Sequence, residues 1–579
     1  TKGTTYLQIM PQYAKAILPD QDLEALWHYL RTLADGDQRG PGQVLLEKAK
    51  EPEIKRLLDV PGEIPVTDRP RVFRAHLAGT SARAIHVGLP NGMNYTFDPR
   101  MLSVRRVWGG GFLNLQQERS GRGKRPSTTG RDGLILLEGE PLLAPLTKNG
   151  ELVDFEFKEP DTQDHQAIAK HLHDGIDFSE KLATLDAEFL RYSYGDADQV
   201  PHFGFRVGKN TITETIRITE NGRLTISLEG SIPEAQGFKL HASGLSEIQV
   251  TGGELKDGIW TLPGKKLPGT YHLTAKLPGG LPGRPEVDGK ENWEPQPVVS
   301  EPTKVIQPDP NRRRRPGKPF ATLAGYRSDT WEAPVDLYGR KQLFAATGMA
   351  VAKDGTIVLT TRASGVWRIR NNKWSLFAEG IFESLGVCIE DDKGDRIVIS
   401  QKPELTRISD TDGDGRADHF ETVCDDFGLH GNYHEYTHGP VRDAKGNYYF
   451  NLNLSDGSQI DLAEACWKAG GKFMGSMGGY RGWACRVSPE GRMELFASGL
   501  RSPAGLGIAP DGRLWYSENQ GEFVGSSKYV PLEEGKFYGH LSGLVDLPGV
   551  TPEAGVDADA WAAKLRKGAV WLPHNKMAN

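Results

Sequence analysis

Short runs in which apolar and polar residues alternate dominate the chain from about residue 70 onward. Clear examples are Thr211–Thr219, Arg223–Leu228 and Tyr271–Lys276. Alternation with a period of two is typical of β-strands that bury one face. The pattern therefore predicts a mainly β protein, with an antiparallel, sandwich-like unit between residues 201 and 280.

A phrase made of glycine, an apolar run and a turn with Asp-Gly or Lys-Gly occurs four times in the C-terminal part. The copies begin at Gly348, Gly386, Gly439 and Gly505, so successive starts lie 38, 53 and 66 residues apart. Repeats of ~40–50 residues with turn signals are typical of four-stranded propeller blades, and longer spacings indicate loop insertions. We therefore expect residues 326–579 to form an incomplete β-propeller that is cut short at its C-terminal end.

The N-terminal segment has a different, helical period. Leu23, Leu26, Trp27 and Leu30 are spaced i, i+3, i+4 and i+7 and so share one helix face, and Gly36 is suited to end the helix. A single short helix cannot bury its own apolar face. We expect it to be the tail of a small helical domain whose front is missing from the chain.

These patterns divide the chain into six segments. We expect a helical domain tail at 1–35, a linker at 36–70, a glycine-rich β domain at 71–150, a helix plus sandwich-like domain at 151–280, a linker rich in proline and arginine at 281–325, and the partial propeller at 326–579.

Composition narrows the possible functions. Lys and Arg number 70 against 76 Asp and Glu, so the net charge of −6 gives no electrostatic reason to bind nucleic acid. No apolar run approaches the ~18 residues of a membrane-spanning helix. The four cysteines include no CxxC pair, which excludes a covalent haem-attachment motif within these residues. They are as compatible with two disulfides as with buried free thiols.

An acidic stretch in the predicted propeller matches the twelve-position calcium loop. It has acidic residues at positions 1, 3, 5, 9 and 12 and glycine at position 6, and calcium prefers such hard oxygen ligands. The alternative is an acidic surface turn that binds no metal. The flanks resemble strands, so we expect a structural Ca²⁺ site rather than a sensor. Its ligands would be Asp410, Asp412, Asp414, the carbonyl of Arg416, Asp418 and Glu421.

Two histidines and an arginine lie just before predicted inner strands. His434 and His438 precede the third repeat, and an imidazole at that position is suited to act as a general base. Arg501 precedes the fourth repeat, where a guanidinium can bind a carboxylate through two hydrogen bonds. The alternatives are a histidine hydrogen-bonded within its loop and an arginine in a surface ion pair.

Met10, which precedes the N-terminal helix, carries a thioether that is suited to bind haem iron, although a lone methionine is ordinarily a core residue. The string Met10-Pro11-Gln12-Tyr13 and the following helix resemble the end of a class I cytochrome c domain. That resemblance implies that Met10 is the axial ligand of a haem c in the intact protein.

Residues 340–545 resemble quinoprotein sugar dehydrogenases of the soluble glucose and sorbosone dehydrogenase type. They resemble still more the cytochrome-fused "membrane-bound dehydrogenase" propellers of planctomycete-like bacteria. The matching strings are Asn432-Tyr433-His434-Glu435, Gly499-Leu500-Arg501-Ser502-Pro503-Ala504-Gly505-Leu506, Ser517-Glu518-Asn519-Gln520-Gly521 and Phe537-Tyr538-Gly539-His540. The resemblance implies a six-bladed type of propeller that holds pyrroloquinoline quinone.

In this family a histidine takes the proton of the sugar hydroxyl and an arginine contacts the quinone. By position these roles fall to His434 and Arg501, with His438 as a second candidate. Ser502 and Ala504 depart from the family, which has amide side chains there.

Two hypotheses follow from these observations. The first is an exported, periplasmic or extracellular dehydrogenase that oxidises a sugar or alcohol and passes electrons to its fused c-type haem and on to a downstream acceptor. A tethered one-electron acceptor is a sensible partner for a two-electron quinol. The second is a cofactor-free, calcium-stabilised propeller that acts as a carbohydrate-binding or scaffold module. An axial pocket that contains both His434 and Arg501 would favour the first, and an apolar plug would favour the second.

Overall fold

The computed structural model describes residues 62–572, except for residues 78–79, 117–126, 131–132, 139, 154–185, 266–268, 280–285, 288, 306–326, 430, 457–473, 477, 522, 549 and 551–555. The predicted helical tail, with Met10, and most of the predicted helix before the sandwich lie outside these residues. Within the described part, no helix has the length and apolar character needed to cross a membrane.

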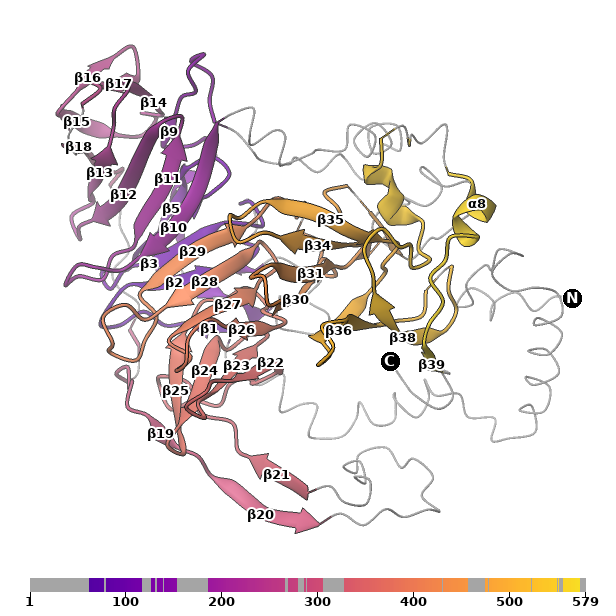
Figure 1. The fold of residues 1–579 in the computed structure, drawn as a ribbon. Coiled ribbons are helices and arrows are strands. Elements are labelled where there is room, and N and C mark those ends of the chain that lie inside the picture. The colour runs from indigo at the N-terminus through magenta and orange to yellow at the C-terminus, as the bar shows by residue number, and fades with distance from the viewer. Residues whose placement is uncertain are drawn as a thin grey trace, which may run out of the picture.

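The first two β-rich segments share one hydrophobic core. Their strands lie next to one another in Figure 1. A five-stranded sheet of order β2-β3-β4-β5-β8 packs against strands β10–β13, and the rings of Phe97 and Phe203 stack across the interface at 4.1 Å. Strand β9 also pairs with β14 of the second segment. Strands in the first segment are β1 (Glu63–Ile64), β2 (Arg71–Arg74), β3 (Ile85–Gly88), β4 (Met93–Asp98), β5 (Ser103–Gly109), β6 (Leu113–Asn114), β7 (Thr128–Thr129), β8 (Leu134–Glu138) and β9 (Leu143–Pro145).

The second segment is an antiparallel sandwich, as its alternating pattern predicts. In β12, Ile212, Ile216 and Ile218 point inward and are buried, while Thr211 and Thr213, on either side of Ile212, are half-buried. The strands are β10 (Ala187–Ser193), β11 (His202–Val207), β12 (Asn210–Ile218), β13 (Arg223–Ser231), β14 (Gln236–Leu240), β15 (Ser246–Thr251), β16 (Glu254–Lys256), β17 (Ile259–Leu262) and β18 (Gly269–Lys276).

The described residues of the C-terminal part form four successive four-stranded antiparallel meanders, which we call blades 1 to 4. They are preceded by β19 (Gln296–Pro297), which adds to blade 1, and by a hairpin of β20 (Ser300–Val305) and β21 (Arg327–Trp331) that projects from the body of the molecule (Figure 1). Blade 1 is β22 (Ala346–Val351), β23 (Ile357–Thr361), β24 (Val366–Arg370) and β25 (Lys373–Ala378); blade 2 is β26 (Val387–Ile389), β27 (Arg396–Ser400), β28 (Leu405–Ser409) and β29 (His419–Cys424).

Blades 3 and 4 carry the longer connections. Blade 3 is β30 (Thr437–Arg442), β31 (Tyr448–Leu452), β34 (Trp483–Val487) and β35 (Met493–Ser498), with a side hairpin of β32 (Ser455–Asp456) and β33 (Met474–Gly475); blade 4 is β36 (Pro503–Ile508), β37 (Leu514–Glu518), β38 (Ser527–Leu532) and β39 (Val570–Leu572), with helices η3 (Ser542–Asp546) and α8 (Ala558–Ala562) between its last two strands.

The repeated glycines lie where the inner strands of successive blades meet. A Cβ atom on Gly348 would stand 2.6 Å from Cα of Gly386, and one on Gly386 would stand 2.1 Å from the carbonyl oxygen of Gly439. A side chain at either position would therefore push the inner strands apart. This close approach accounts for the glycines that begin the first two copies of the repeat.

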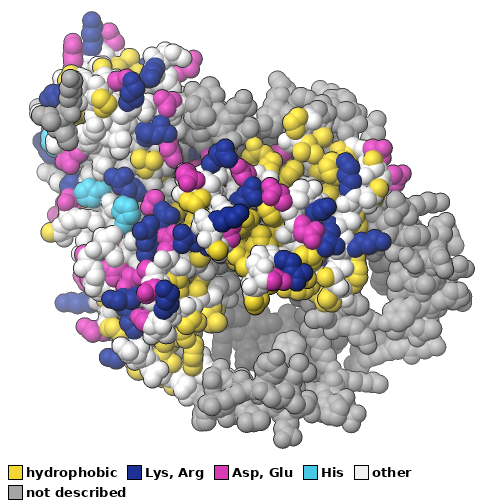
Figure 2. All heavy atoms as spheres, in the orientation of Figure 1, with side chains coloured by type: hydrophobic (Ala, Val, Ile, Leu, Met, Phe, Trp, Pro, Cys, Tyr) yellow, Lys and Arg dark blue, Asp and Glu magenta, His cyan; other side chains and the backbone are white. Residues whose placement is uncertain are grey.

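Both N-terminal units are joined to the propeller. Strand β10 pairs with β29, which makes the sandwich sheet and blade 2 one ten-stranded sheet. The first unit packs on the blade 1 and blade 2 loops through buried ion pairs of Arg71 with Glu379 and of Arg74 with Glu404, the latter at 2.8 Å. Figure 2 shows charged side chains of both signs mixed with hydrophobic ones over the described surface.

Cys388, Cys424 and Cys485 are free thiols, whereas Cys466 lies outside the described residues. Cys424 and Cys485 are buried, and burial raises the pKa of both thiols well above the usual range. The described cysteines thus match the free-thiol alternative.

Candidate functional site

The connections from the outer strand of one blade to the inner strand of the next lie at one end of the blades. His434 is in the connection before β30, and Arg501 is in the connection before β36. Because inner strands β30 and β36 are in contact, the two connections lie side by side. The fold therefore brings together two residues that are 67 positions apart in the sequence.

Hydrogen bonds orient the His434 imidazole. Its Nδ1 is 2.9 Å from the carbonyl oxygen of Leu454, which can only accept a hydrogen bond. The proton therefore lies on Nδ1, and Nε2 carries the lone pair of a neutral ring. Nε2 lies 3.5 Å from the hydroxyl oxygen of Ser502. This is the arrangement that a general base requires.

Arg501 is buried beside the same hydroxyl group. Its Nη1 lies 3.4 Å from Oγ of Ser502, and only 8% of the residue is exposed. The side chain runs over Gly521, where a Cβ atom would stand 2.3 Å from Cδ of Arg501. Ser502 thus lies between the imidazole and the guanidinium, and no apolar side chain separates the three groups in these contacts.

A buried carboxylate fixes the Arg501 connection. The backbone N–H groups of Arg501 and Ser502 donate to Glu518 at 3.2 and 2.8 Å. Burial raises the pKa of Glu518, while the nearby Lys528 ammonium and the two N–H donors oppose this rise. Burial in turn lowers the pKa of Lys528 to about 8. Glu518 therefore acts on the site through the backbone.

Lys402 forms the side of the site toward blade 1. Its Nζ is 2.7 Å from Oε2 of Glu383 and donates to the carbonyl oxygen of Tyr433 at 2.9 Å. The ammonium also lies 4.9 Å from the ring centre of Tyr436, which is 5.7 Å from the ring centre of His434. A cation and an aromatic ring therefore stand next to the candidate base.

The second histidine, His438, lies on β30 beyond Tyr436, with 6.3 Å between their ring centres. Burial lowers the pKa of His438 to about 4, and His434 adds a smaller effect in the same direction. The His438 imidazole is thus neutral throughout the physiological range. Of the two histidines, His434 is the one that shares the Ser502 hydroxyl with Arg501.

The predicted calcium loop lies elsewhere, in the turn between β28 and β29. Lys402 is in the turn at the other end of β28, and the five residues of that strand span about 16 Å. Carboxylate oxygens of Asp410, Asp412 and Asp414 lie within 4.8 Å of one another.

The remaining predicted ligands of that loop have other partners. Asp418 accepts from the backbone N–H and the hydroxyl of Thr411, and Glu421 on β29 is paired with Arg407 at 2.7 Å. The Arg416 side chain is stacked over Trp293 at 4.4 Å. Three of the six predicted positions thus converge through their side chains. Met10, the predicted haem ligand, lies outside the described residues.

Sequence reasoning did not identify Ser502, Glu518, Lys402 or Glu383 as members of the site. In the sequence, Ser502 stands out only as a departure from the family, and Glu518 only as part of a matching string. The sequence signal that could have identified these residues is a charged residue next to each blade connection. Lys402 and Glu383 carry it, but their partners come from different blades and no local pattern pairs them.

Residues 370–539 match the model of a domain family described as a domain of unknown function (DUF7133). No curated protein matches the chain.

Solved structures with similarity include dehydrogenases of sugars. One is an oxidoreductase named as a glucose dehydrogenase from Thermus thermophilus, at 18% identity, 40% coverage of this chain, 71% of that chain and a TM-score of 0.29. Another is the PQQ domain of pyranose dehydrogenase from Coprinopsis cinerea. It is 15% identical, the match covers 40% of this chain and 66% of that chain, and the TM-score is 0.30. A third is the PQQ-bound aldose sugar dehydrogenase from Streptomyces coelicolor. It is 14% identical, the match covers 40% of this chain and 69% of that chain, and the TM-score is 0.26. At these TM-scores the site must be judged on its own geometry.

That geometry is compatible with a planar, carboxylate-bearing quinone. The Arg501 guanidinium and the Tyr436 ring, with Lys402 behind it, offer a cation and a stacking surface. Asn453, whose backbone N–H donates to Tyr436 at 3.0 Å, is 3% exposed, and its Oδ1 has no hydrogen-bond partner in the described part of the chain. A buried polar atom without a partner is costly and is suited to meet a ligand donor.

Proposed function

We propose that the chain is the propeller part of a quinoprotein-type dehydrogenase that oxidises a sugar or alcohol. The observation that supports this function is the contact of one hydroxyl group, that of Ser502, with both Nε2 of His434 and Nη1 of Arg501. A substrate hydroxyl at the same place would meet a proton acceptor and a positive charge together.

Under this proposal, His434 and Arg501 have different roles in the reaction. His434 takes the hydroxyl proton on Nε2, while Nδ1–H remains bonded to Leu454 and holds the ring in place. Arg501 stabilises the negative charge that develops on the substrate oxygen. When bound, pyrroloquinoline quinone supplies the hydride-accepting group, and Arg501, Tyr436 and Asn453 are the residues that would hold it.

The wider assignment belongs to the same proposal. Export to the periplasm or outside the cell, a fused c-type haem with Met10 as axial ligand, and a downstream electron acceptor come from the sequence resemblance. We also propose that Asp410, Asp412 and Asp414 bind Ca²⁺ together with the carbonyl of Arg416, as a structural site. Three converging carboxylates are the hard oxygen donors that calcium prefers.

The dehydrogenase is tested by a dye-reduction assay. The full chain is incubated with pyrroloquinoline quinone and Ca²⁺, and sugar-dependent reduction of an artificial electron acceptor is measured over a panel of aldoses and polyols. His434→Gln should lower kcat by about 10²–10⁴-fold, since that is what removal of a general base costs. His241→Gln, at a histidine of the sandwich, is the matched control and should leave kcat unchanged.

Two results would count against the proposal. One is the absence of sugar-dependent reduction for the whole panel, which would favour the cofactor-free carbohydrate-binding alternative if a sugar still binds. The other is full activity of His434→Gln, which would exclude His434 as the base.

A further inference from the structure

The Ser502 hydroxyl lies between a base and a cation, which is the position of a nucleophile. Its Oγ is 3.5 Å from Nε2 of His434 and 3.4 Å from Nη1 of Arg501. The residue is half-buried at the end of the blades. The hydroxyl can therefore donate its proton to the imidazole while it accepts a hydrogen bond from the guanidinium.

The His434 imidazole is held in the orientation that such a pair requires. Nδ1–H donates to the carbonyl oxygen of Leu454 at 2.9 Å, which leaves Nε2 toward Ser502. A nucleophilic serine has a base within hydrogen-bond reach that a third group orients, and this distance is often longer in a ligand-free site. In this chain a backbone carbonyl serves as the third group.

Arg501 supplies the positive charge that a serine nucleophile needs. Its guanidinium contacts Oγ of Ser502 and so stabilises negative charge on that oxygen. The carbonyl oxygen of an attacked ester is bonded to the same carbon atom as Oγ, so it stays within reach of the guanidinium. A fixed cation beside a developing oxyanion lowers the barrier to acyl transfer. Glu518 accepts from the backbone N–H groups of both residues and keeps the hydroxyl next to the guanidinium.

We propose that Ser502 is a nucleophile and that the chain hydrolyses carboxylic esters at this site, an activity beyond the proposed dehydrogenase. Oγ attacks the carbonyl carbon of the ester while Nε2 of His434 takes its proton. The bond to the alcohol then breaks, and His434 returns the proton to the leaving oxygen, which leaves the acyl group on Ser502. Water, deprotonated by the same nitrogen, attacks the acyl group, and Ser502 regains its proton as the acid departs. Ester and water thus give acid and alcohol without an electron acceptor.

Hydrolysis of p-nitrophenyl acetate by the full chain, without quinone or electron acceptor, tests this activity separately from sugar oxidation. His434→Gln should lower kcat by about 10²–10⁴-fold, as loss of a general base does. Ser502→Ala should fall to the same level and the double variant no lower, because a nucleophile and its base act as a unit. Mass spectrometry of the acid-quenched parent should find the acetyl group on Ser502.

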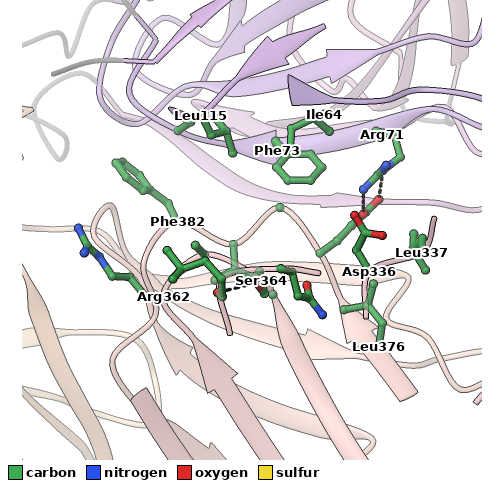
Figure 3. Close-up of a pocket in the computed structure, with 18 of the residues that line it drawn as sticks. Ile64, Arg71, Phe73, Leu115, Asp336, Leu337, Arg362, Ser364, Leu376 and Phe382 are labelled. Atoms are coloured by element: carbon green, nitrogen blue, oxygen red, sulfur yellow. Dashed lines mark hydrogen bonds and ion pairs between the residues drawn. The ribbon is translucent and has the colours of Figure 1, made fainter. Parts of the chain in front are cut away.

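Two other half-buried serines provide matched controls, because each has only one of the two partners. Oγ of Ser227 in β13 is 3.0 Å from Nδ1 of His272, but no arginine or lysine is among its hydrogen-bond partners in the described part of the chain. Ser364 lines a cavity together with Arg362 (Figure 3). No histidine is among the residues that line this cavity, and the Ser364 hydroxyl donates to the carbonyl oxygen of Leu343 at 2.8 Å. Ser227→Ala and Ser364→Ala should hydrolyse the ester as the parent does, and thermal unfolding shows whether each variant is folded.

The proposal is overturned if folded Ser502→Ala hydrolyses the ester as the parent does, or if the acetyl group is found on His434 alone. It is also overturned if the parent is no faster than His434→Gln. Absence of sugar oxidation would count against the dehydrogenase and not against this activity, and the reverse also holds, because the ester assay uses no cofactor.

Discussion

Replacement of Glu214 should stabilise the protein, and increasingly so as the pH rises. Glu214 occupies an inward position of β12, between the buried Ile212 and Ile216, and is fully buried. Neither of its carboxyl oxygens has a hydrogen-bond partner among the described residues. The same holds for the hydroxyl of Tyr95, which is buried near it.

The magnitude follows from the pKa. Burial raises the pKa of Glu214 to about 8, against ~4.3 for an unperturbed glutamate. Between these values the folded chain holds a proton that the unfolded chain has lost, so stability falls as the pH rises and levels off above pH ~8. At about 1.36 kcal/mol for each pKa unit, the total loss is on the order of 5 kcal/mol.

Urea unfolding followed by tryptophan fluorescence measures this loss, because Trp260 is buried in the same sandwich. Glu214→Gln and Glu214→Leu cannot ionise, so the difference in free energy of unfolding between each variant and the parent should grow from pH ~4 to ~8. Glu229→Gln, at an exposed position of the neighbouring strand β13, is the control and should give no such trend. A difference for Glu214→Gln that does not change with pH would refute the reasoning.

Three further outcomes are expected. Asp412→Asn should abolish terbium luminescence and remove the rise in Tm that Ca²⁺ gives the parent. At a 100-fold excess of Ca²⁺ over Kd, that rise corresponds to about 2.7 kcal/mol of stability. Equal Ca²⁺ responses of variant and parent would exclude the loop as a metal site. Glu404→Gln, which leaves the buried Arg74 without its ion partner, should cost about 3–5 kcal/mol and speed hydrogen exchange in β2, and unchanged exchange would contradict this. His438 should show no NMR titration above pH ~5, because burial lowers its pKa to about 4. The stability contributed by its neutral ring is complete above pH ~6.5 and is lost as the pH falls towards 4. Titration of His438 near pH ~6.5 would show that its ring is solvated.

Local periodicity was sufficient to predict individual strands and the order of the blades. The glycine phrases coincide with inner strands, and at Gly348 and Gly386 the steric limit that requires glycine is local to the residue. The alternation in Thr211–Thr219 likewise predicted a strand with one buried face, since burial of one face is a property of that strand alone.

Long-range pairing had no comparable signal. The β10–β29 pair joins residues more than 200 positions apart, and the core shared by Phe97 and Phe203 crosses a predicted domain boundary. The hydrogen bonds of an edge strand are made by the backbone, which carries no sequence information. Ser502 was missed as the link between His434 and Arg501 for the same reason, because its partner comes from another blade.

Leu454 of blade 3 supports both halves of the candidate site: its carbonyl oxygen accepts from Nδ1 of His434, and its N–H donates to the carbonyl oxygen of Arg501 at 2.9 Å. The two halves differ in their other supports. The Arg501 connection is fixed within blade 4 by Glu518. The His434 connection also has contacts from outside its blade. Lys402 donates to the carbonyl oxygen of Tyr433, and the His76 ring of the first unit packs so closely on Gly431 that a Cβ atom there would stand 2.5 Å from Cε1 of His76. The first β unit therefore packs directly on the loop that carries His434. Under the proposed function, a change at this contact should affect proton removal by His434 more than it affects the binding of charge by Arg501, so the first unit contributes to the candidate site.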